Sequence, residues 1–214
     1  RGRAFVTGAL PYSPWWLLLI AVLLVVAVSA AAWVVNPVSA GCVFLGAFFY
    51  GVVYTVWLKR RSWLNIVIGG LAGSFAVLAG AAAVDPALGP HGLLLALVLF
   101  LWTPPHFWSL AIANHEEYAA AGIPMLPVVV GTARAARIVL WSTLALALTA
   151  LLPGLFGAGP VYMAGAVAGG GYFIYKTWRL AQAPLRKTAM GAFFASLVQL
   201  SLLLAAATLD SLLR

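Results

Sequence analysis

The chain has 214 residues, of which 64% are hydrophobic and only 7% are charged. Since a soluble domain carries about a quarter charged residues, this composition excludes an ordinary soluble protein and is typical of an integral membrane protein. The formal net charge of +8 comes from basic residues in short segments between apolar stretches. Such residues set membrane topology and contact anionic headgroups, so we expect membrane lipid and no nucleic acid as a partner.

Apolar stretches of roughly 20 residues follow one another along the chain. Each is long enough to cross a hydrocarbon core of about 30 Å as a helix, and none shows the alternating pattern of a barrel strand. We therefore expect an all-α, polytopic transmembrane helical bundle, with residues 1–214 forming a single membrane-embedded domain. The seven expected spans are residues 15–35, 39–58, 64–84, 92–113, 134–153, 160–178 and 189–209.

The distribution of basic residues predicts the orientation of the bundle. Lys and Arg accumulate in the short cytoplasmic loops of membrane proteins. Basic clusters precede the first expected span and follow the second, fourth and sixth, which puts them all on one side. We expect this side to be the cytoplasmic face of a cell inner membrane, with the mouth of any active site opening there. Its basic residues are Arg1, Arg3, Lys59, Arg60, Arg61, Arg134, Arg137, Lys176, Arg179, Arg186 and Lys187.

The segment LWTPPHFWSLAIANHEEYAAAGIPMLPVVVG, residues 101–131, holds much of the rare polar chemistry. Pro104 and Pro105 remove two backbone donors inside the fourth span and predict a kink. His106 follows within the span, where an ionisable residue is a functional candidate by default. We expect it to contact a ligand or substrate; a packing histidine bonded to a neighbouring carbonyl is the alternative.

Two adjacent carboxylates, Glu116 and Glu117, follow the fourth span at its cytoplasmic end. Such a pair suits Mg²⁺, which takes oxygen ligands and is usually bound by one or two carboxylates together with substrate phosphates. An ordinary solvated loop with a helix-capping glutamate is the alternative.

The loop LKRRSWLN, residues 58–65, places Lys59 and Arg60 on the same side as the glutamates. Cations from one loop and metal-binding carboxylates from another are the parts that hold a diphosphate, although topology alone also explains such a cluster. Tyr54, one turn earlier, either faces a cavity or anchors the interface. Asn65 shares a helix face with Gly69 and Gly73, whose spacing favours close helix packing.

These segments carry a resemblance. YTVWLKRRSWLNIVIGG (54–70) and residues 101–131 resemble the two best-marked segments of the protohaem farnesyltransferases, or haem O synthases, of the intramembrane UbiA-type prenyltransferase family. The resemblance implies transfer of a farnesyl group from farnesyl diphosphate to a vinyl group of haem B, giving haem O for terminal oxidases. It further implies Mg²⁺ as cofactor, held by two acidic motifs, and haem A synthase as a candidate partner.

The resemblance also assigns roles to residues. The family's second acidic motif falls on Glu116 and Glu117, where aspartates are more usual, and these two would hold the metal. Lys59 and Arg60 would contact the diphosphate, and His106 the haem. The remaining candidates for substrate binding are Asn65, Tyr54, Tyr118 and Arg3.

The start of the chain departs from the family pattern. Family members have nine spans, and their first acidic motif, N-D-x-x-D, precedes an Arg-rich segment that resembles RGRAFVTG at residues 1–8. We therefore expect a truncated or misplaced start, two further spans before Arg1, and little turnover from this chain alone. A haem-binding or transport protein without catalysis is the alternative, but the polar residues cluster at one face and no internal repeat is evident, which favours an enzyme.

Overall fold

The computed structural model describes residues 8, 11 and 13–213, and every regular element within them is a helix. This confirms the all-α bundle. The elements are α1 (Trp15–Val34), α2 (Pro37–Phe48), the π-helix η1 (Phe49–Leu58), α3 (Asn65–Gly69), α4 (Leu71–Val84), α5 (Pro90–Ala113), α6 (His115–Ala120), α7 (Leu126–Val130), α8 (Thr132–Thr149), the 3₁₀-helix η2 (Leu152–Phe156), α9 (Pro160–Gln182) and α10 (Arg186–Leu212).

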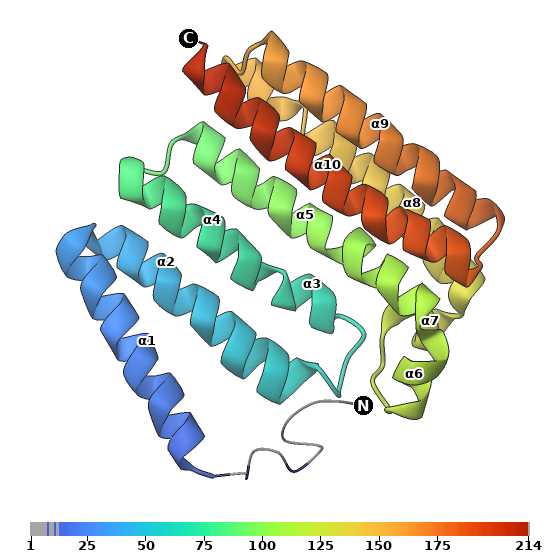
Figure 1. Cartoon of the computed structure of the whole chain (residues 1–214), viewed down its shortest axis with the longest axis horizontal. Coiled ribbons are helices and arrows are strands. Elements are labelled where there is room, and N and C mark those ends of the chain that lie inside the picture. The colour runs from blue at the N-terminus through green and yellow to red at the C-terminus, as the bar shows by residue number, and fades with distance from the viewer. Residues whose placement is uncertain (1–7, 9–10, 12, 214) are drawn as a thin grey trace.

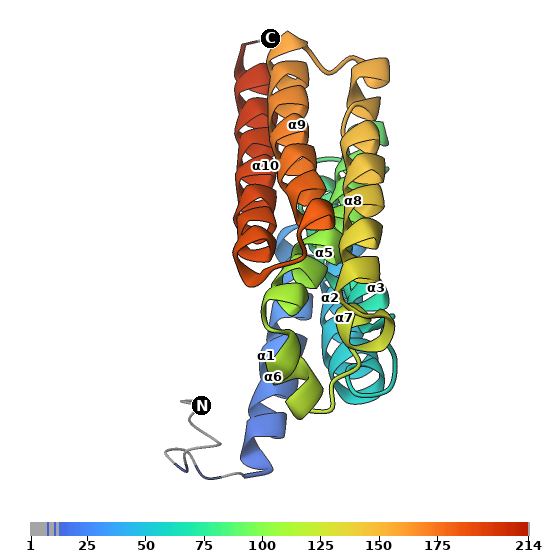
Figure 2. The ribbon, with the colours of Figure 1, turned by 90° about the vertical axis from the view of Figure 1, so that its right-hand side faces the viewer.

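Each of the seven expected spans corresponds to one long helical unit. Six of these units, among the described residues, are both long and apolar enough to cross a membrane. The seventh is α9, which has 23 residues but contains several glycines and tyrosines that lower its hydropathy. It packs between α8 and α10, and the three run side by side in Figure 2.

The long helices stand alongside one another with their ends at two opposite faces. Figure 1 shows α1, α2, α4, α5 and α10 in a row, while the short helices α6 and α7 lie together at one end of α5. At that end the chain also turns between η1 and α3 and between α9 and α10. The polar segments that the sequence singled out therefore meet at the same end of the bundle.

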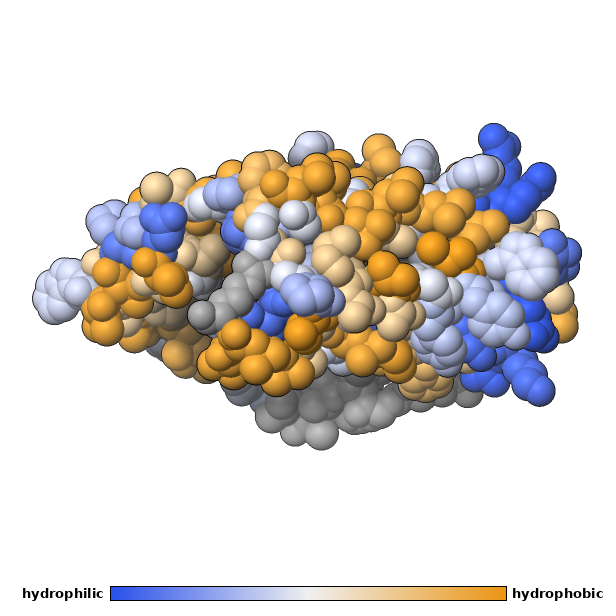
Figure 3. Space-filling model, turned by 90° about the horizontal axis from the view of Figure 1, so that it is seen from above, coloured by the Kyte–Doolittle hydropathy of each residue, from blue (hydrophilic) through white to orange (hydrophobic). Residues whose placement is uncertain are grey.

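The flanks of the bundle are apolar and exposed, as a lipid-facing surface must be. Trp33 is 93% exposed and Trp141 70%, and α1 has no buried residue at all. Figure 3 shows orange apolar atoms along the flank and a concentration of hydrophilic residues at the right-hand end. This distribution supports the prediction of a multi-span membrane protein.

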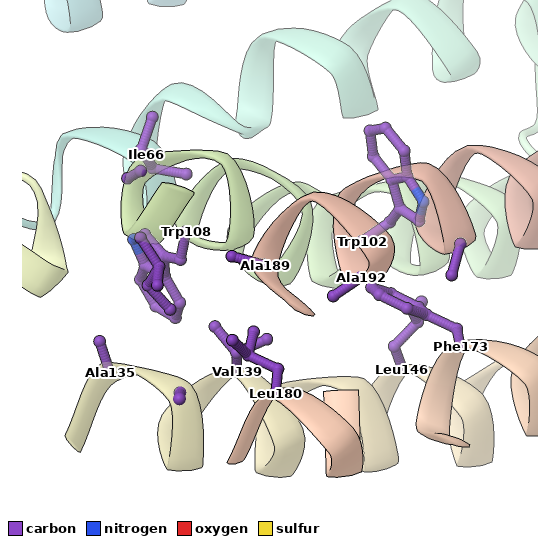
Figure 4. Packing of buried hydrophobic residues seen from close by; sticks show 14 of the residues in the cluster. Ile66, Trp102, Trp108, Ala135, Val139, Leu146, Phe173, Leu180, Ala189 and Ala192 are labelled. Carbon is purple, nitrogen blue, oxygen red and sulfur yellow. The ribbon is translucent and has the colours of Figure 1, made fainter. Parts of the chain in front are cut away.

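The core lies between α5, α8, α9 and α10. Figure 4 shows Trp102 of α5 near Ala192 of α10, with Leu146 of α8 and Phe173 of α9 beneath them. Small residues let the last two helices approach closely, because a Cβ on Gly169 would lie 3.1 Å from the Cα of Gln199. A Cβ on Gly165, four residues earlier on α9, would likewise lie 3.2 Å from the Leu202 carbonyl oxygen of α10, the close approach that small residues four apart on one helix face allow.

Two details of helix geometry concern the expected third and fourth spans. The third span divides at Gly70 into α3 and α4, and α5 approaches closely at this glycine, where a Cβ would lie 3.1 Å from the Cβ of Thr103. In contrast, α5 remains a continuous helix through Pro104 and Pro105, both of which are buried. Neighbouring helices cover the site of the missing donors, which is the setting in which membrane helices tolerate proline.

Candidate functional site

A polar hollow of 660 Å³ lies at the end of the bundle where η1 and α5 end. It joins segments about 60 residues apart in the sequence, because Lys59 and Arg60 form one wall and Glu117 and Tyr118 another. The lining residues are Thr55, Lys59, Arg60, Asn114, Glu117, Tyr118, Ala121 and Ile123. The two cations and a carboxylate predicted to act together thus share one site.

The two glutamates do not face the same space. Glu116 lines only a second polar hollow of 500 Å³, whereas Glu117 lines both hollows. The lining of the second hollow is Ile112, Ala113, Asn114, His115, Glu116, Glu117, Thr132 and Arg186. Successive residues of a helix point about 100° apart, so one of two adjacent glutamates on α6 turns towards the basic loop and the other turns away.

The charges of the polar hollow are not neutralised by each other. Among the described residues, no ion pair joins Lys59 or Arg60 to Glu117. The side chains of Arg60 and Glu117 are exposed and that of Lys59 is half-buried. The hollow therefore offers both cationic donors and a carboxylate to a ligand that enters it.

The π-helix η1 determines how the basic loop meets the apolar interior. Its ladder ends with the Lys59 amide donating to the Tyr54 carbonyl at 2.9 Å, five residues back, and the Thr55 hydroxyl donates to the Tyr50 carbonyl at 2.7 Å. In an α-helix, side chains five residues apart point about 140° apart, but in the wider π-helix they point only about 50° apart. The Lys59 ammonium accordingly lies 5.9 Å from the centre of the Tyr54 ring.

An aromatic hollow of 390 Å³ lies beside the polar hollow, further along η1 and α5. The two meet at the end of η1, since Tyr54 lines the aromatic hollow and its ring lies 5.9 Å from the ammonium of Lys59, a residue that lines the polar one. The lining residues are Tyr50, Tyr54, Ile66, Gly69, Gly70, Ala72, Gly73, Leu99, Trp102, Thr103 and Phe107. Tyr54 thus faces a cavity, as one reading of the sequence predicted.

Asn65 lies beneath the basic loop instead of in either of the hollows just described. It is only 1% exposed, and its side-chain amide donates to the Lys59 carbonyl at 3.2 Å. Its Oδ1 atom is buried without a hydrogen-bond partner. These contacts give Asn65 a role in holding the backbone of Lys59, while the contact with substrate stays a prediction.

His106 is 7% exposed and lies between two aromatic rings, Trp102 at 4.1 Å and Phe193 at 4.6 Å between ring centres. Its Nδ1 atom is 2.7 Å from the Ser196 hydroxyl, which itself donates to the Phe193 carbonyl at 2.6 Å. Because that hydroxyl proton is already used, the hydroxyl accepts from Nδ1–H, which leaves Nε2 of His106 as an acceptor. His106 lines none of the hollows described above, so its contact with haem also stays a prediction.

Some lining residues were not among the predicted site residues. Of the predicted ones, Arg3 lies outside the described residues. Asn114 lines both polar hollows and Arg186 the second, but a single asparagine and one more loop arginine carry no local signal. Ser196, the partner of His106, is 90 residues away in the sequence. Only packing of α10 against α5 brings these two side chains together.

The fold and the site define a polytopic helical membrane protein in which a charged hollow at one end adjoins an aromatic hollow in the interior. A family model described as the UbiA prenyltransferase family matches residues 1–204, and the chain belongs to this family. No solved structure matches the chain.

Curated relatives are similar along nearly the whole chain. Protoheme IX farnesyltransferase 2 of Paramagnetospirillum magneticum is 59% identical over 213 residues, which cover 100% of the chain and 74% of the relative. Protoheme IX farnesyltransferase 1 of the same organism is 50% identical over 190 residues, covering 88% of the chain and 67% of the relative. The protoheme IX farnesyltransferase of Roseiflexus castenholzii is 44% identical over 210 residues, 97% of the chain and 39% of the relative.

Proposed function

We propose that this protein is a haem O synthase, which transfers the farnesyl group of farnesyl diphosphate to a vinyl group of haem B. The observation that carries the proposal is the meeting of Lys59, Arg60 and Glu117 around one hollow that adjoins an aromatic, apolar hollow. A prenyl diphosphate has the same division into a charged head and an apolar tail. The relatives whose names specify farnesyl transfer to protohaem support this choice of substrates.

Lys59 and Arg60 would bind the diphosphate, since cationic donors around a leaving group stabilise the charge that it develops. The carboxylate of Glu117 fits Mg²⁺ shared with phosphate oxygens. No group of three or more His, Cys, Asp or Glu side chains capable of holding a metal occurs in the described part of the chain. When bound there with Glu117, Mg²⁺ would neutralise diphosphate charge, and Glu116, which lines only the second polar hollow, would contribute less to holding it.

The reaction separates charge at the boundary of the two hollows. The bond between C1 of the farnesyl group and the diphosphate oxygen breaks, and the electron pair leaves with the diphosphate. The vinyl group of haem then forms a carbon–carbon bond to C1, and water adds to the resulting cation and releases a proton. Tyr54 and Trp102 line the aromatic hollow, where their rings would stabilise the allylic cation and help exclude water.

The orientation is part of the same proposal. The polar hollow lies at the end where Lys59, Arg60, Arg134, Arg137, Arg186 and Lys187 gather at helix ends, so it would open to the cytoplasmic side of the inner membrane. Its product would then be available to an enzyme that oxidises haem O, such as haem A synthase.

The direct test is to incubate the purified full-length gene product with haem B, farnesyl diphosphate and Mg²⁺ and to look for haem O by mass spectrometry. We expect a Mg²⁺-dependent product that carries one farnesyl group and one hydroxyl more than haem B. Haem binding without any prenylated product would contradict the proposal and favour a protein that binds or transports haem.

A further inference from the structure

Beyond the aromatic hollow, two more hollows continue along α5 towards the opposite end of the bundle. The first, here called the leucine hollow, has a volume of 140 Å³ and is lined by Val77, Leu95, Val98, Leu99, Leu200, Leu203 and Leu204. The second, the outer hollow, has a volume of 160 Å³ and is lined by His91, Leu95, Pro153, Ala158, Tyr162, Ala207, Asp210 and Ser211. Leu99 belongs to both the aromatic and the leucine hollow, and Leu95 to both the leucine and the outer hollow.

Leu99 is therefore the side chain that stands between the aromatic hollow and the leucine hollow. It is half-buried and lies against α4 at a glycine: a Cβ on Gly73 would be 3.3 Å from the Cδ2 atom of Leu99. The glycine gives the leucine room to lie across the space between α4 and α5. Removing the isobutyl group of Leu99 would therefore widen the passage between the aromatic hollow and the leucine hollow.

The dimensions fit a prenyl chain that enters with its diphosphate in the polar hollow. Along α5, the aromatic hollow extends from Phe107 to Leu99, which is about 12 Å at the rise of an α-helix, and the leucine hollow adds about 6 Å. One isoprene unit adds four carbon atoms to the chain length, about 5 Å, which is close to one helical turn. With the first isoprene unit at the boundary with the polar hollow, the aromatic hollow is long enough for the second and third units, and the leucine hollow is about one unit deep.

We propose that Leu99 limits the length of the prenyl chain that the protein accepts, by closing the aromatic hollow behind the third isoprene unit. The proposal rests on the proposed function, because it assumes that a prenyl diphosphate is the substrate. The apolar lining of the leucine hollow, with leucines from α5 and α10, is suited to a fourth isoprene unit once Leu99 is shortened.

The test compares the wild type with Leu99→Ala in the full-length gene product, using haem B, Mg²⁺ and three substrates: geranyl, farnesyl and geranylgeranyl diphosphate. We expect the ratio of kcat/KM for geranylgeranyl over farnesyl diphosphate to rise about tenfold or more in Leu99→Ala, since a few methylene groups in an apolar pocket discriminate by this much. The opposite change, Gly73→Ala, presses on Leu99 and should favour geranyl over farnesyl diphosphate.

A matched control is Leu97→Ala, two residues away on the same helix. Leu97 is 42% exposed and lines none of the hollows described here, so its replacement should leave the substrate ratio unchanged. If Leu99→Ala fails to fold, Leu99→Val is used. Binding is measured separately, as protection against thermal unfolding by non-hydrolysable thiolodiphosphates of the three chain lengths.

The outcomes separate the two proposals. If the wild type transfers no prenyl group and is not stabilised by any thiolodiphosphate, the proposed function fails. If the wild type transfers farnesyl but folded Leu99 variants keep its chain-length ratio in both turnover and binding, the assignment of Leu99 is wrong while the proposed function stands.

Discussion

Glu116 and Glu117 are chemically identical neighbours, yet the structure gives them different surroundings. Glu117 lines the polar hollow together with Lys59 and Arg60, whereas Glu116 lines only the second polar hollow. Electrostatic stabilisation depends on where a charge is held relative to the group that reacts. The two carboxylates should therefore contribute unequally to catalysis.

We expect Glu117→Gln to lower kcat/KM for farnesyl diphosphate about a hundredfold, because it removes the carboxylate nearest the basic loop, and Glu116→Gln to lower it less than about tenfold. Both substitutions keep the size of the side chain, so folding should be unaffected. The measurement is the rate of haem O formation as a function of Mg²⁺ concentration. Equal losses in the two variants would refute this assignment.

At the scale of elements, η1 and α3 position Tyr54 between the two hollows. The π-helix brings Tyr54 and Lys59 onto nearly the same face, and Gly69 lets the tyrosine ring lie against α3. A Cβ at position 69 would be 2.7 Å from Cδ2 of Tyr54 and 3.1 Å from its Cγ, so an added methyl must displace the ring.

Gly69→Ala should consequently lower kcat/KM about tenfold, because Tyr54 can no longer occupy its place beside the polar hollow. The matched control is Gly80→Ala in α4, where no heavy atom lies within 4 Å of an added Cβ. Rates of both variants are measured alongside their thermal unfolding. A similar loss in both would mean that the position of Tyr54 is not the cause.

The contact between α9 and α10 leads to a second prediction at the scale of elements. A Cβ at Gly169 would meet the backbone of Gln199, which cannot move aside as a flexible side chain can, whereas Gly171 on the same helix has open space. Gly169→Ala should destabilise the protein by about 1–3 kcal/mol through overpacking, and Gly171→Ala should not. Thermal unfolding in detergent would show a lower midpoint for the first variant only; equal midpoints would contradict the packing account.

On the scale of the whole molecule, charge is distributed along the axis of the bundle. Basic residues gather at the end that contains the polar hollows, while the flanks expose tryptophan, leucine and valine. Under the positive-inside rule this asymmetry favours the proposed orientation, in which the polar hollow would open to the cytoplasm.

Cysteine labelling tests that orientation. In a background lacking the only cysteine, Cys42→Ala, we expect Ala87→Cys in the loop between α4 and α5 to react with a membrane-impermeant maleimide in intact spheroplasts. Lys187→Cys at the start of α10 should react only after the membrane is opened. If instead only Lys187→Cys reacted in intact spheroplasts, the orientation would be opposite to the proposed one.

The sequence alone determined the class of the protein and most of its elements. Long apolar stretches can cross a bilayer only as helices, so the positions of the spans follow from composition and need no knowledge of packing. The exceptions are two details of helix winding: nothing in residues 49–58 distinguishes a π-helix from an α-helix, and nothing in the local sequence marks Gly70 as the point where the third span divides into α3 and α4.

The site was predictable as a set of residues but not as an arrangement. Lys59, Arg60 and Glu117 are recognisable by their charge in an apolar chain, and the structure brings them to one hollow. Tertiary structure alone decided that Glu116 faces elsewhere, that His106 is enclosed by Trp102 and Phe193, and that Leu99 separates two hollows. Local patterns give a side chain its chemistry, whereas the direction in which it points depends on helices that are distant in the sequence.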